Sequence, residues 1–263
     1  MWKDITEFWD SLGWIANLLE IVSALGFISI FIYRYSKKRN NIGTFNYKNL
    51  SELVKHKVKD INQVKCKIIS DSKIAIVNDN PADFPIEYLK KINLKIETIE
   101  KTSLSDYEKF SRYDLVMLDI AGVVAEDMKE GGLELIKRIN SLNRRPQIIA
   151  VSSKKFDPKA SEFFSIADEV MSKPIREKEC EEAIISLLLQ KFSPFHASEE
   201  IDKSISCSNM NSKQVIMLYK YLFKYVYGMA ERDTTRNVLT NKYAFLDVDT
   251  MLSNVDIIKG FLR

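Results

Sequence analysis

The chain is poor in the residues that carry thiolate and imidazole chemistry. Its 263 residues include three cysteines, far apart and odd in number, and two isolated histidines. The cysteines show no disulfide or metal spacing, so reduced cytosolic thiols are expected. The isolation of the histidines argues against zinc binding and against histidine-based catalysis.

The chain also has little excess of either charge and few glycine motifs. The net charge of +3 is too small to indicate a nucleic-acid partner, and we expect none. We find no nucleotide-binding glycine motif and no phosphoacceptor-type helix, which argues against a kinase. With 46% hydrophobic and 29% charged residues, most of the chain should fold into one or two domains.

One long apolar run lies near the N-terminus. Residues 14–33 read WIANLLEIVSALGFISIFIY, which is about the length of one bilayer-spanning helix. Tryptophans open the run and tyrosines close it, as at the two membrane interfaces. The residues before it are mainly acidic and those after it are basic, so the positive-inside rule places the C-terminal side in the cytoplasm. We predict an extracytoplasmic segment over 1–12 and a single transmembrane helix over 13–34, in the cell (inner) membrane.

The alternatives for this run are a cleaved signal peptide, a buried globular helix and an interfacial helix. The acidic leader and the basic cluster after the run oppose a signal peptide. Glu20 weakens the prediction of a span, because a carboxyl group in lipid is costly and often faces a partner helix. Small residues at 16, 23, 24 and 26 would permit close helix contact, so a homo-oligomer through this helix is a hypothesis.

Residues 35–71 form a polar and basic juxtamembrane linker. Apolar residues recur there at helical spacing, which predicts a helix from about Lys48 to Lys65. Its lysines are expected to form a solvated face or to contact anionic lipid of the bilayer.

Strand and helix patterns alternate over residues 72–193. A continuous apolar run within YDLVMLDI (residues 113–120) is typical of a strand buried on both faces. Five such units predict a doubly wound, five-stranded parallel sheet. The expected strands are Lys73–Asp79, Leu94–Glu100 (near an edge), Asp114–Asp119, Gln147–Ser153 and Asp168–Pro174, and the expected helices are Tyr88–Ile92, Ser105–Ser111, Leu133–Leu142, Pro158–Ile166 and Glu177–Phe192.

Polar side chains stand where four of these strands end. The first ends at Asn78-Asp79, the third at Asp119, the fourth at Ser152-Ser153 and the fifth at Lys173-Pro174. In a parallel sheet these ends share one edge, where open α/β folds bind ligands. Two carboxylates, a hydroxyl and an ammonium are therefore expected to converge.

This set resembles the receiver domain of two-component response regulators, a flavodoxin-like fold. The resemblance rests on IVNDNP, YDLVMLDI, the Gly131-Gly132-Leu133 helix entry, IIAVSS and ADEVMSKP. It implies that Asp119 accepts a phosphoryl group with help from Mg²⁺. The implied metal ligands are Asp79, Asp119 and the backbone carbonyl of Ala121, and the implied partners of the phosphoryl group are Lys173 and Ser152.

The chain departs from the family pattern at several positions. Asn78 replaces one acidic residue, which should lower metal affinity, although its side-chain oxygen could still hold a metal-bound water. The loop after Asp119 carries Glu126, Asp127 and Glu130, which either reach the metal or form a solvated acidic loop. Val170 stands at the aromatic switch position, so a Tyr or Phe rotamer switch is absent.

Residues 194–263 are predicted to form a small α-helical tail. His196–Asn211 is polar and is interpreted as a linker, and helices are expected over Lys213–Glu231, with an aromatic-rich apolar stripe, and over Asp249–Leu262. About 50 residues is small for an independent core, so we expect this tail to pack on the receiver-like domain, on the juxtamembrane helix or on another protomer.

The sequence thus favours a membrane-anchored, response-regulator-like signalling protein. Its partners would be a histidine kinase or phosphotransfer protein, and its chemistry at most self-dephosphorylation. The alternative is a pseudo-receiver that is not phosphorylated, acting as a scaffold or as a membrane effector of the stress or phage-defence type through protein contacts and transmembrane oligomerisation.

Overall fold

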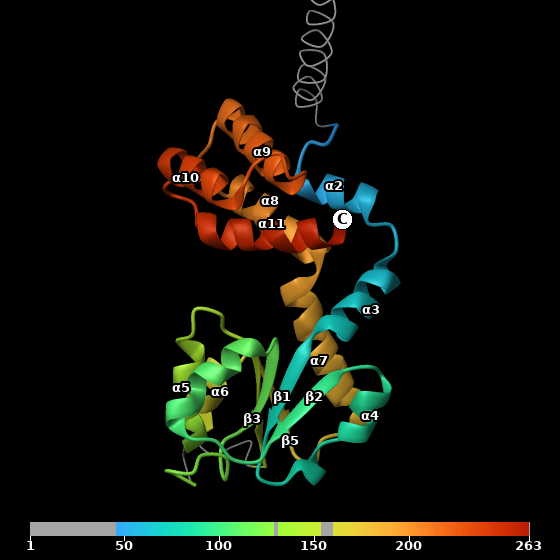
Figure 1. Ribbon diagram of the computed structural model, residues 1–263, viewed down its shortest axis with the longest axis vertical. Coiled ribbons are helices and arrows are strands. Elements are labelled where there is room, and N and C mark those ends of the chain that lie inside the picture. The colour runs from blue at the N-terminus through green and yellow to red at the C-terminus, as the bar shows by residue number, and fades with distance from the viewer. Residues whose placement is uncertain (1–45, 129–130, 154–159, 263) are drawn as a thin grey trace, which may run out of the picture. The chain divides into compact units, whose positions relative to one another are not determined.

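The computed structural model describes residues 46–128, 131–153 and 160–262 (Figure 1). The chain divides into two compact units, Met1–Lys48 and Asn49–Arg263, and every element named below belongs to the second. The predicted transmembrane helix over 13–34 lies outside the described residues. Among the helices that the structure describes, none combines the length and the apolarity needed to cross a bilayer.

Five parallel strands form one sheet, in the order β2-β1-β3-β4-β5. Each strand pairs in parallel with its neighbours, which confirms the predicted five-stranded parallel sheet. The bounds are β1 Lys73–Val77, β2 Lys95–Ile99, β3 Leu115–Asp119, β4 Gln147–Ser152 and β5 Glu169–Ser172.

The burial of each strand follows its place in the sheet. All five residues of the central strand β3 are buried, whereas none of the five residues of the edge strand β2 is. Continuous apolar runs suit strands covered on both faces, and the more polar β2 sequence suits an edge. The prediction that the Leu94–Glu100 strand lies near an edge is therefore confirmed.

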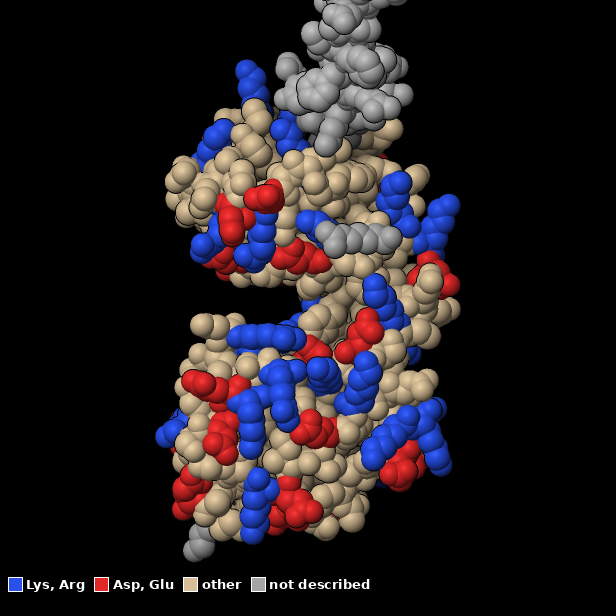
Figure 2. Space-filling view, in the orientation of Figure 1, with Lys and Arg blue, Asp and Glu red and all other residues tan. Residues whose placement is uncertain are grey.

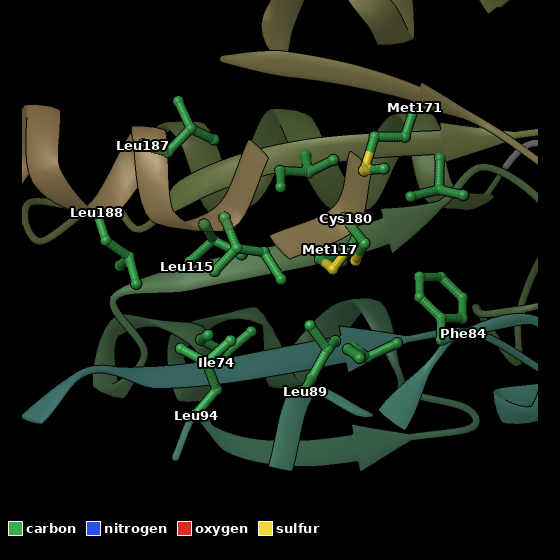
Figure 3. Close-up of a cluster of buried hydrophobic side chains, with 14 of the residues drawn as sticks. Ile74, Phe84, Leu89, Leu94, Leu115, Met117, Met171, Cys180, Leu187 and Leu188 are labelled. Atoms are coloured by element: carbon green, nitrogen blue, oxygen red, sulfur yellow. The ribbon is translucent and has the colours of Figure 1, made fainter. Parts of the chain in front are cut away.

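Helices cover both faces of the sheet. One face packs Ile74, Leu115 and Ile149 against α3, α4 and α7, in the cluster drawn in Figure 3. The alternate residues of the same strands, such as Ala75 and Val116, pack against η2, α5 and α6. This alternation is the period-2 geometry of a strand with two cores. The bounds are α3 Ile61–Asp71, α4 Ile86–Lys91, η2 Leu104–Arg112, α5 Gly131–Asn140, α6 Ala160–Ile166 and α7 Glu177–Phe192, and a short 3₁₀ turn, η1 Pro81–Asp83, precedes α4.

The single helix predicted over Lys48–Lys65 is wrong, because the structure has two helices there. The first, α2, spans Leu50–Lys57, and the second is α3. Asp60 interrupts the pattern, since its side chain accepts hydrogen bonds from the backbone N–H groups of Asn62 and Gln63 and so caps α3.

The linker predicted over His196–Asn211 is also wrong over most of its length. Helix α8, Pro194–Ser206, occupies it, with proline at its first position and Ala197, Ile201 and Ile205 buried at four-residue spacing. The other C-terminal helices are α9 Ser212–Val226, α10 Arg232–Lys242 and α11 Val248–Leu262, and the last lies within one residue of the prediction Asp249–Leu262.

Helix α2 packs against α8, although about 140 residues separate them in the chain. Asp202 of α8 accepts hydrogen bonds from the first backbone N–H groups of α2, Leu50 at 3.2 Å and Ser51 at 2.9 Å. It also accepts one from the hydroxyl of Tyr219 in α9, at 2.8 Å. A carboxylate at a helix N-terminus satisfies unpaired donors and complements the helix dipole. Helices α2 and α8–α11 therefore form one helical body that is discontinuous in sequence.

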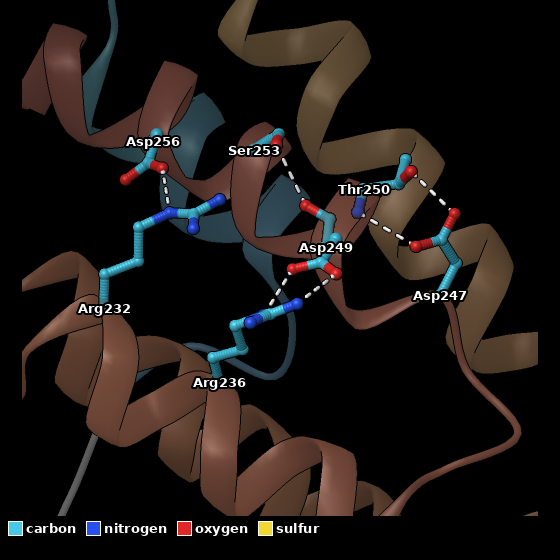
Figure 4. Close-up of polar contacts among 7 residues, drawn as sticks. All are labelled: Arg232, Arg236, Asp247, Asp249, Thr250, Ser253 and Asp256. Carbon is cyan, nitrogen blue, oxygen red and sulfur yellow. Dashed lines mark hydrogen bonds and ion pairs between the residues drawn. The ribbon is translucent and has the colours of Figure 1, made fainter. Parts of the chain in front are cut away.

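Polar contacts join α10 to α11 on the surface of this helical body (Figure 4). Arg236 contacts Asp249 through two nitrogens at 2.7 and 2.8 Å, and Arg232 contacts Asp256 at 3.0 Å. Both pairs are well exposed, so they orient the helices more than they stabilise them. Acidic and basic side chains are intermixed on the face shown in Figure 2, in keeping with the small net charge.

Candidate functional site

The candidate site lies at the carboxyl edge of the sheet, around Asp119. Asp119 is the last residue of β3, Asn78 directly follows β1 and Lys173 directly follows β5. Because the strands are parallel, their C-terminal ends meet at this edge. Asp119 and Asn78 are buried.

Two side chains converge on one oxygen of Asp119. The ammonium of Lys173 contacts Asp119 Oδ2 at 2.7 Å, and the amide of Asn78 donates to the same oxygen at 2.8 Å. The other oxygen, Oδ1, accepts a long hydrogen bond of 3.4 Å from the backbone N–H of Ala121. Within the described part of the chain, two side chains therefore hold Oδ2, whereas Oδ1 has only this long hydrogen bond.

Asn78 is held in this orientation by the backbone of Asn80. Its side-chain oxygen accepts a hydrogen bond from the N–H of Asn80 at 2.6 Å, so its NH₂ group faces Asp119. An aspartate at this position could not donate, and its charge would repel Asp119 in a buried site. Asn78 thus donates a hydrogen bond directly to Asp119, and its oxygen, proposed from sequence to hold a metal-bound water, accepts one from Asn80.

The charge of Lys173 is stabilised by the carboxylates around it. Burial alone would lower the pKa of the ammonium, but hydrogen bonds to Asp119 and Asp83 outweigh burial and raise the pKa. Lys173 is therefore charged throughout the physiological range and can neutralise an anion bound to Asp119.

Asp79 lies against the turn that follows Asp119. Gly122 in that turn has φ +80°, and a Cβ atom built on it would lie 2.3 Å from Asp79 Oδ2. Only a residue without a side chain fits between the backbone and this carboxylate. At the start of α5, a Cβ on Gly132 would lie 2.6 Å from the carbonyl oxygen of Asp119, so the helix entry also packs closely on the site.

Ser152 ends β4, one residue beyond Val151, which is the register partner of Asp119. It is buried, and its backbone carbonyl accepts a hydrogen bond of 3.2 Å from the N–H of Lys173. Its position therefore places it at the same edge of the sheet as Asp119 and Lys173. The role of its hydroxyl group stays a prediction.

Sequence reasoning missed one residue of the site, Asp83. It ends η1, and its Oδ2 accepts a hydrogen bond from Lys173 at 2.6 Å. The sequence signal was available, since Asp83 is a second carboxylate four residues after Asp79 in the same strand-end loop.

Glu126, in the acidic loop after Asp119, contacts the start of η2. Glu126 accepts hydrogen bonds from the hydroxyl of Ser103 and from the N–H of Leu104, at the start of η2. These bonds hold the pKa of Glu126 below its usual value. The structure thus uses Glu126 to cap η2, which favours a structural role over metal binding, and Glu130 lies outside the described residues.

The donor set at this edge suits Mg²⁺ better than a metal that needs many protein ligands. Among the described residues, no three His, Cys, Asp or Glu side chains come together in a way that could hold a metal ion. Mg²⁺ commonly binds through one or two carboxylates, with waters and phosphate oxygens completing its shell. Asp79, Asp119 and the carbonyl of Ala121 offer hard oxygen atoms of this kind, and their role as metal ligands stays a prediction.

Comparison with curated proteins finds a sensory transduction protein. No family model matches the chain. The sensory transduction protein LytR of Staphylococcus epidermidis is 31% identical over 140 residues, and the match spans 51% of each chain. The chain therefore spans about half the length of this curated relative.

Two of the similar solved structures are receiver domains. A CheY-like receiver domain protein from Methanospirillum hungatei is 20% identical and covers 44% of this chain and 93% of its own, with a TM-score of 0.38. The receiver domain of the sensor histidine kinase PA1611 from Pseudomonas aeruginosa, solved with magnesium in its active-site cleft, is 16% identical with a TM-score of 0.37, and it covers 44% of this chain and 97% of its own. Since these scores are low, the function proposed below is supported by the site geometry and the sequence motifs.

Proposed function

We propose that this chain is a response-regulator-like signalling protein in which Asp119 accepts a phosphoryl group in a Mg²⁺-dependent reaction. The main support for this proposal is the set of contacts made by the Asp119 carboxylate. Lys173 and Asn78 both bind Oδ2 of Asp119, which leaves Oδ1 as an oriented nucleophile beside a positive charge.

The proposed donor is the phosphohistidine of a histidine kinase or of a phosphotransfer protein. Asp119 Oδ1 attacks phosphorus, the new O–P bond forms, and the P–N bond to the donor imidazole breaks with its electron pair left on nitrogen, which takes up a proton. The positive charge of Lys173 offsets the charge of the transferred group. Bound Mg²⁺ would neutralise the negative charge shared by nucleophile and phosphoryl group, and Asp79, Asp119 and the Ala121 carbonyl are the residues that would hold it.

The test is phosphorylation of the full chain by a small-molecule donor. Wild-type protein is incubated with acetyl phosphate and Mg²⁺ and is followed by intact-mass spectrometry. We expect the mass of one phosphoryl group, lost in Asp119→Asn and without Mg²⁺. Asp233→Asn, an exposed change in α10, is the matched control and should behave as wild type. No phosphoryl gain with acetyl phosphate, and no Mg²⁺-dependent binding of beryllofluoride, would refute the proposal.

A second candidate function is a pseudo-receiver that serves as a scaffold or membrane effector. Asn78 favours it, because a neutral side chain that donates to Asp119 stands where the family pattern has a second acidic residue. In that case Asp119→Asn would leave the signalling output of a cell unchanged. In the phosphorylated alternative it would abolish that output.

We also propose that residues 13–34 anchor the protein in the cell membrane, with the described part of the chain on the cytoplasmic side. The length of the apolar run and the basic residues after it support this. Membrane fractionation tests the anchor, with a chain that begins at residue 46 as the control. Recovery of the intact chain in the soluble fraction would refute it.

A further inference from the structure

Asp83 shares the site lysine with Asp119. Lys173 Nζ lies 2.6 Å from Asp83 Oδ2 and 2.7 Å from Asp119 Oδ2. The other oxygen of Asp83 accepts a hydrogen bond of 2.8 Å from the side-chain amide of Asn80. Asp83 is thus fixed from both sides and aimed at the ammonium.

The two carboxylates share one positive charge. An ammonium has three N–H donors, so it can bind both oxygens at once. A phosphoryl group on Asp119 would bring further negative charge to this point, and Lys173 would have to turn toward it. Each contact that Lys173 keeps with Asp83 is then one that it withholds from the phosphoryl oxygens.

We propose that Asp83 is a positioning residue that holds Lys173 in the resting state and so restrains phosphorylation of Asp119. The inference rests on the proposed function, and it adds a residue whose carboxylate acts through the lysine. Asp83 opposes phosphorylation in two ways, because it retains the ammonium of Lys173 and repels the incoming anion. Removing its charge should therefore favour the phosphorylated state.

The Lys173–Asp83 pair has the burial that this role needs. The side chain of Lys173 is 18% exposed and that of Asp83 is 31% exposed, so the contact is only partly screened by solvent. Asp83→Asn keeps the size and an oxygen that can accept from Asn80, so the charge is removed with little change in shape.

The experiment measures the affinity of the full chain for beryllofluoride, a phosphoryl mimic, at saturating Mg²⁺. We expect Asp83→Asn to bind about three- to tenfold more tightly than wild type, the scale of one partly screened ion pair plus one like-charge repulsion. Asp83→Glu restores the carboxylate and should return the affinity toward wild type. Glu87→Gln removes a charge from the next helix, where the side chain is 84% exposed and pairs with Lys90 at 3.7 Å, and should have no effect.

A second measurement does not depend on the phosphoryl mimic. A double-mutant cycle of Asp83→Asn and Lys173→Met, by urea unfolding in metal-free buffer, reports the coupling of the two side chains. We expect the two changes to be non-additive. Additive changes would overturn the inference, because Asp83 would then not hold the lysine.

The outcomes separate this inference from the proposed function. If wild type binds beryllofluoride and Asp83→Asn binds with equal or lower affinity, the restraint is refuted and phosphorylation of Asp119 stands. If neither protein binds it, the proposed function fails and takes the restraint with it. Binding by Asp83→Asn alone would support both, with Asp83 as a strong restraint.

Discussion

Replacing Gly122 by alanine tests whether the turn after Asp119 is shaped around Asp79. The added Cβ would lie 2.3 Å from Oδ2, 2.6 Å from Cγ and 3.1 Å from Cβ of Asp79. These distances are well inside van der Waals contact, so the carboxylate of Asp79 must rotate away. Gly122→Ala should therefore displace a proposed metal ligand without touching Asp119 itself.

Gly122→Ala should change two quantities that can be measured separately, the free energy of unfolding and the Mg²⁺ affinity. An alanine held at φ near +80° costs about 1–2 kcal/mol of folding free energy. Displacing one of two carboxylate ligands should weaken Mg²⁺ binding at least about tenfold, which is the lower end of what loss of a supporting ligand contact costs. The first change is a stability effect, and the second is specific to the site.

Gly228 supplies the matched control. Its φ is +68°, and a Cβ there would meet nothing within 4 Å. Gly228→Ala should therefore lose a similar amount of stability and leave metal binding unchanged. Urea unfolding measures the free energy of unfolding, and Mn²⁺ proton relaxation with Mg²⁺ competition measures the affinity. Equal metal affinities in the two variants would refute the assignment of Asp79 as a ligand.

Three further predictions follow from the same contacts. Asn78→Asp should raise Mg²⁺ affinity about tenfold or more, because it restores a carboxylate ligand, and metal titration measures this affinity. It should also lower the free energy of unfolding of the metal-free protein by roughly 1–3 kcal/mol, because it replaces a donor to Asp119 by a like charge, and urea unfolding measures this loss. Asp202→Ala should cost about 1–3 kcal/mol by leaving donors of α2 and α9 unpaired, measured by thermal unfolding. Burial raises the pKa of the Cys180 thiol to about 12, so a thiol reagent at pH 8 should modify the two exposed cysteines quickly and Cys180 only on unfolding.

The same thiol makes a pH-dependent contribution to stability. Its folded pKa lies above its unfolded value, so its contribution is complete below about pH 8.5 and is lost as the pH rises toward about 12.

Three results would contradict these predictions: equal Mg²⁺ affinity in Asn78→Asp and wild type, an unchanged melting temperature in Asp202→Ala, and three thiols that react at one rate.

The sequence was most informative where local pattern and topology coincide. The apolar run of β3 predicts a strand buried on both faces, and parallel pairing then brings the end of that strand to the same edge as the ends of β1 and β5. The rule places Asp119 and Lys173 at one edge because each stands within one residue of a strand end, whereas the hydrogen bond from Asn78 to Asp119 was not predicted. Their contacts in the structure agree with that placement.

The sequence was less informative where a contact depends on the path of a loop. Asp83 reaches Lys173 because η1 turns back toward β5, and no periodic pattern predicts that turn. Helix α8 was missed because its serines and charges hide a buried stripe of three residues. The pairing of α2 with α8 confirms one of the alternatives expected for the C-terminal tail, packing on the juxtamembrane helix, but the sequence alone did not decide between them.

The helical body built from α2 and α8–α11 makes the sheet domain an insertion within it. The chain leaves α2 through residues 58–60 and returns at Ser193, which ends α7 and also precedes the first turn of α8. Deleting the C-terminal helices would thus uncover Leu50, Leu53 and Val54 of α2, at the other end of the sequence. A rearrangement that moves α3 relative to α7 would therefore act on the helical body through both connecting segments at once.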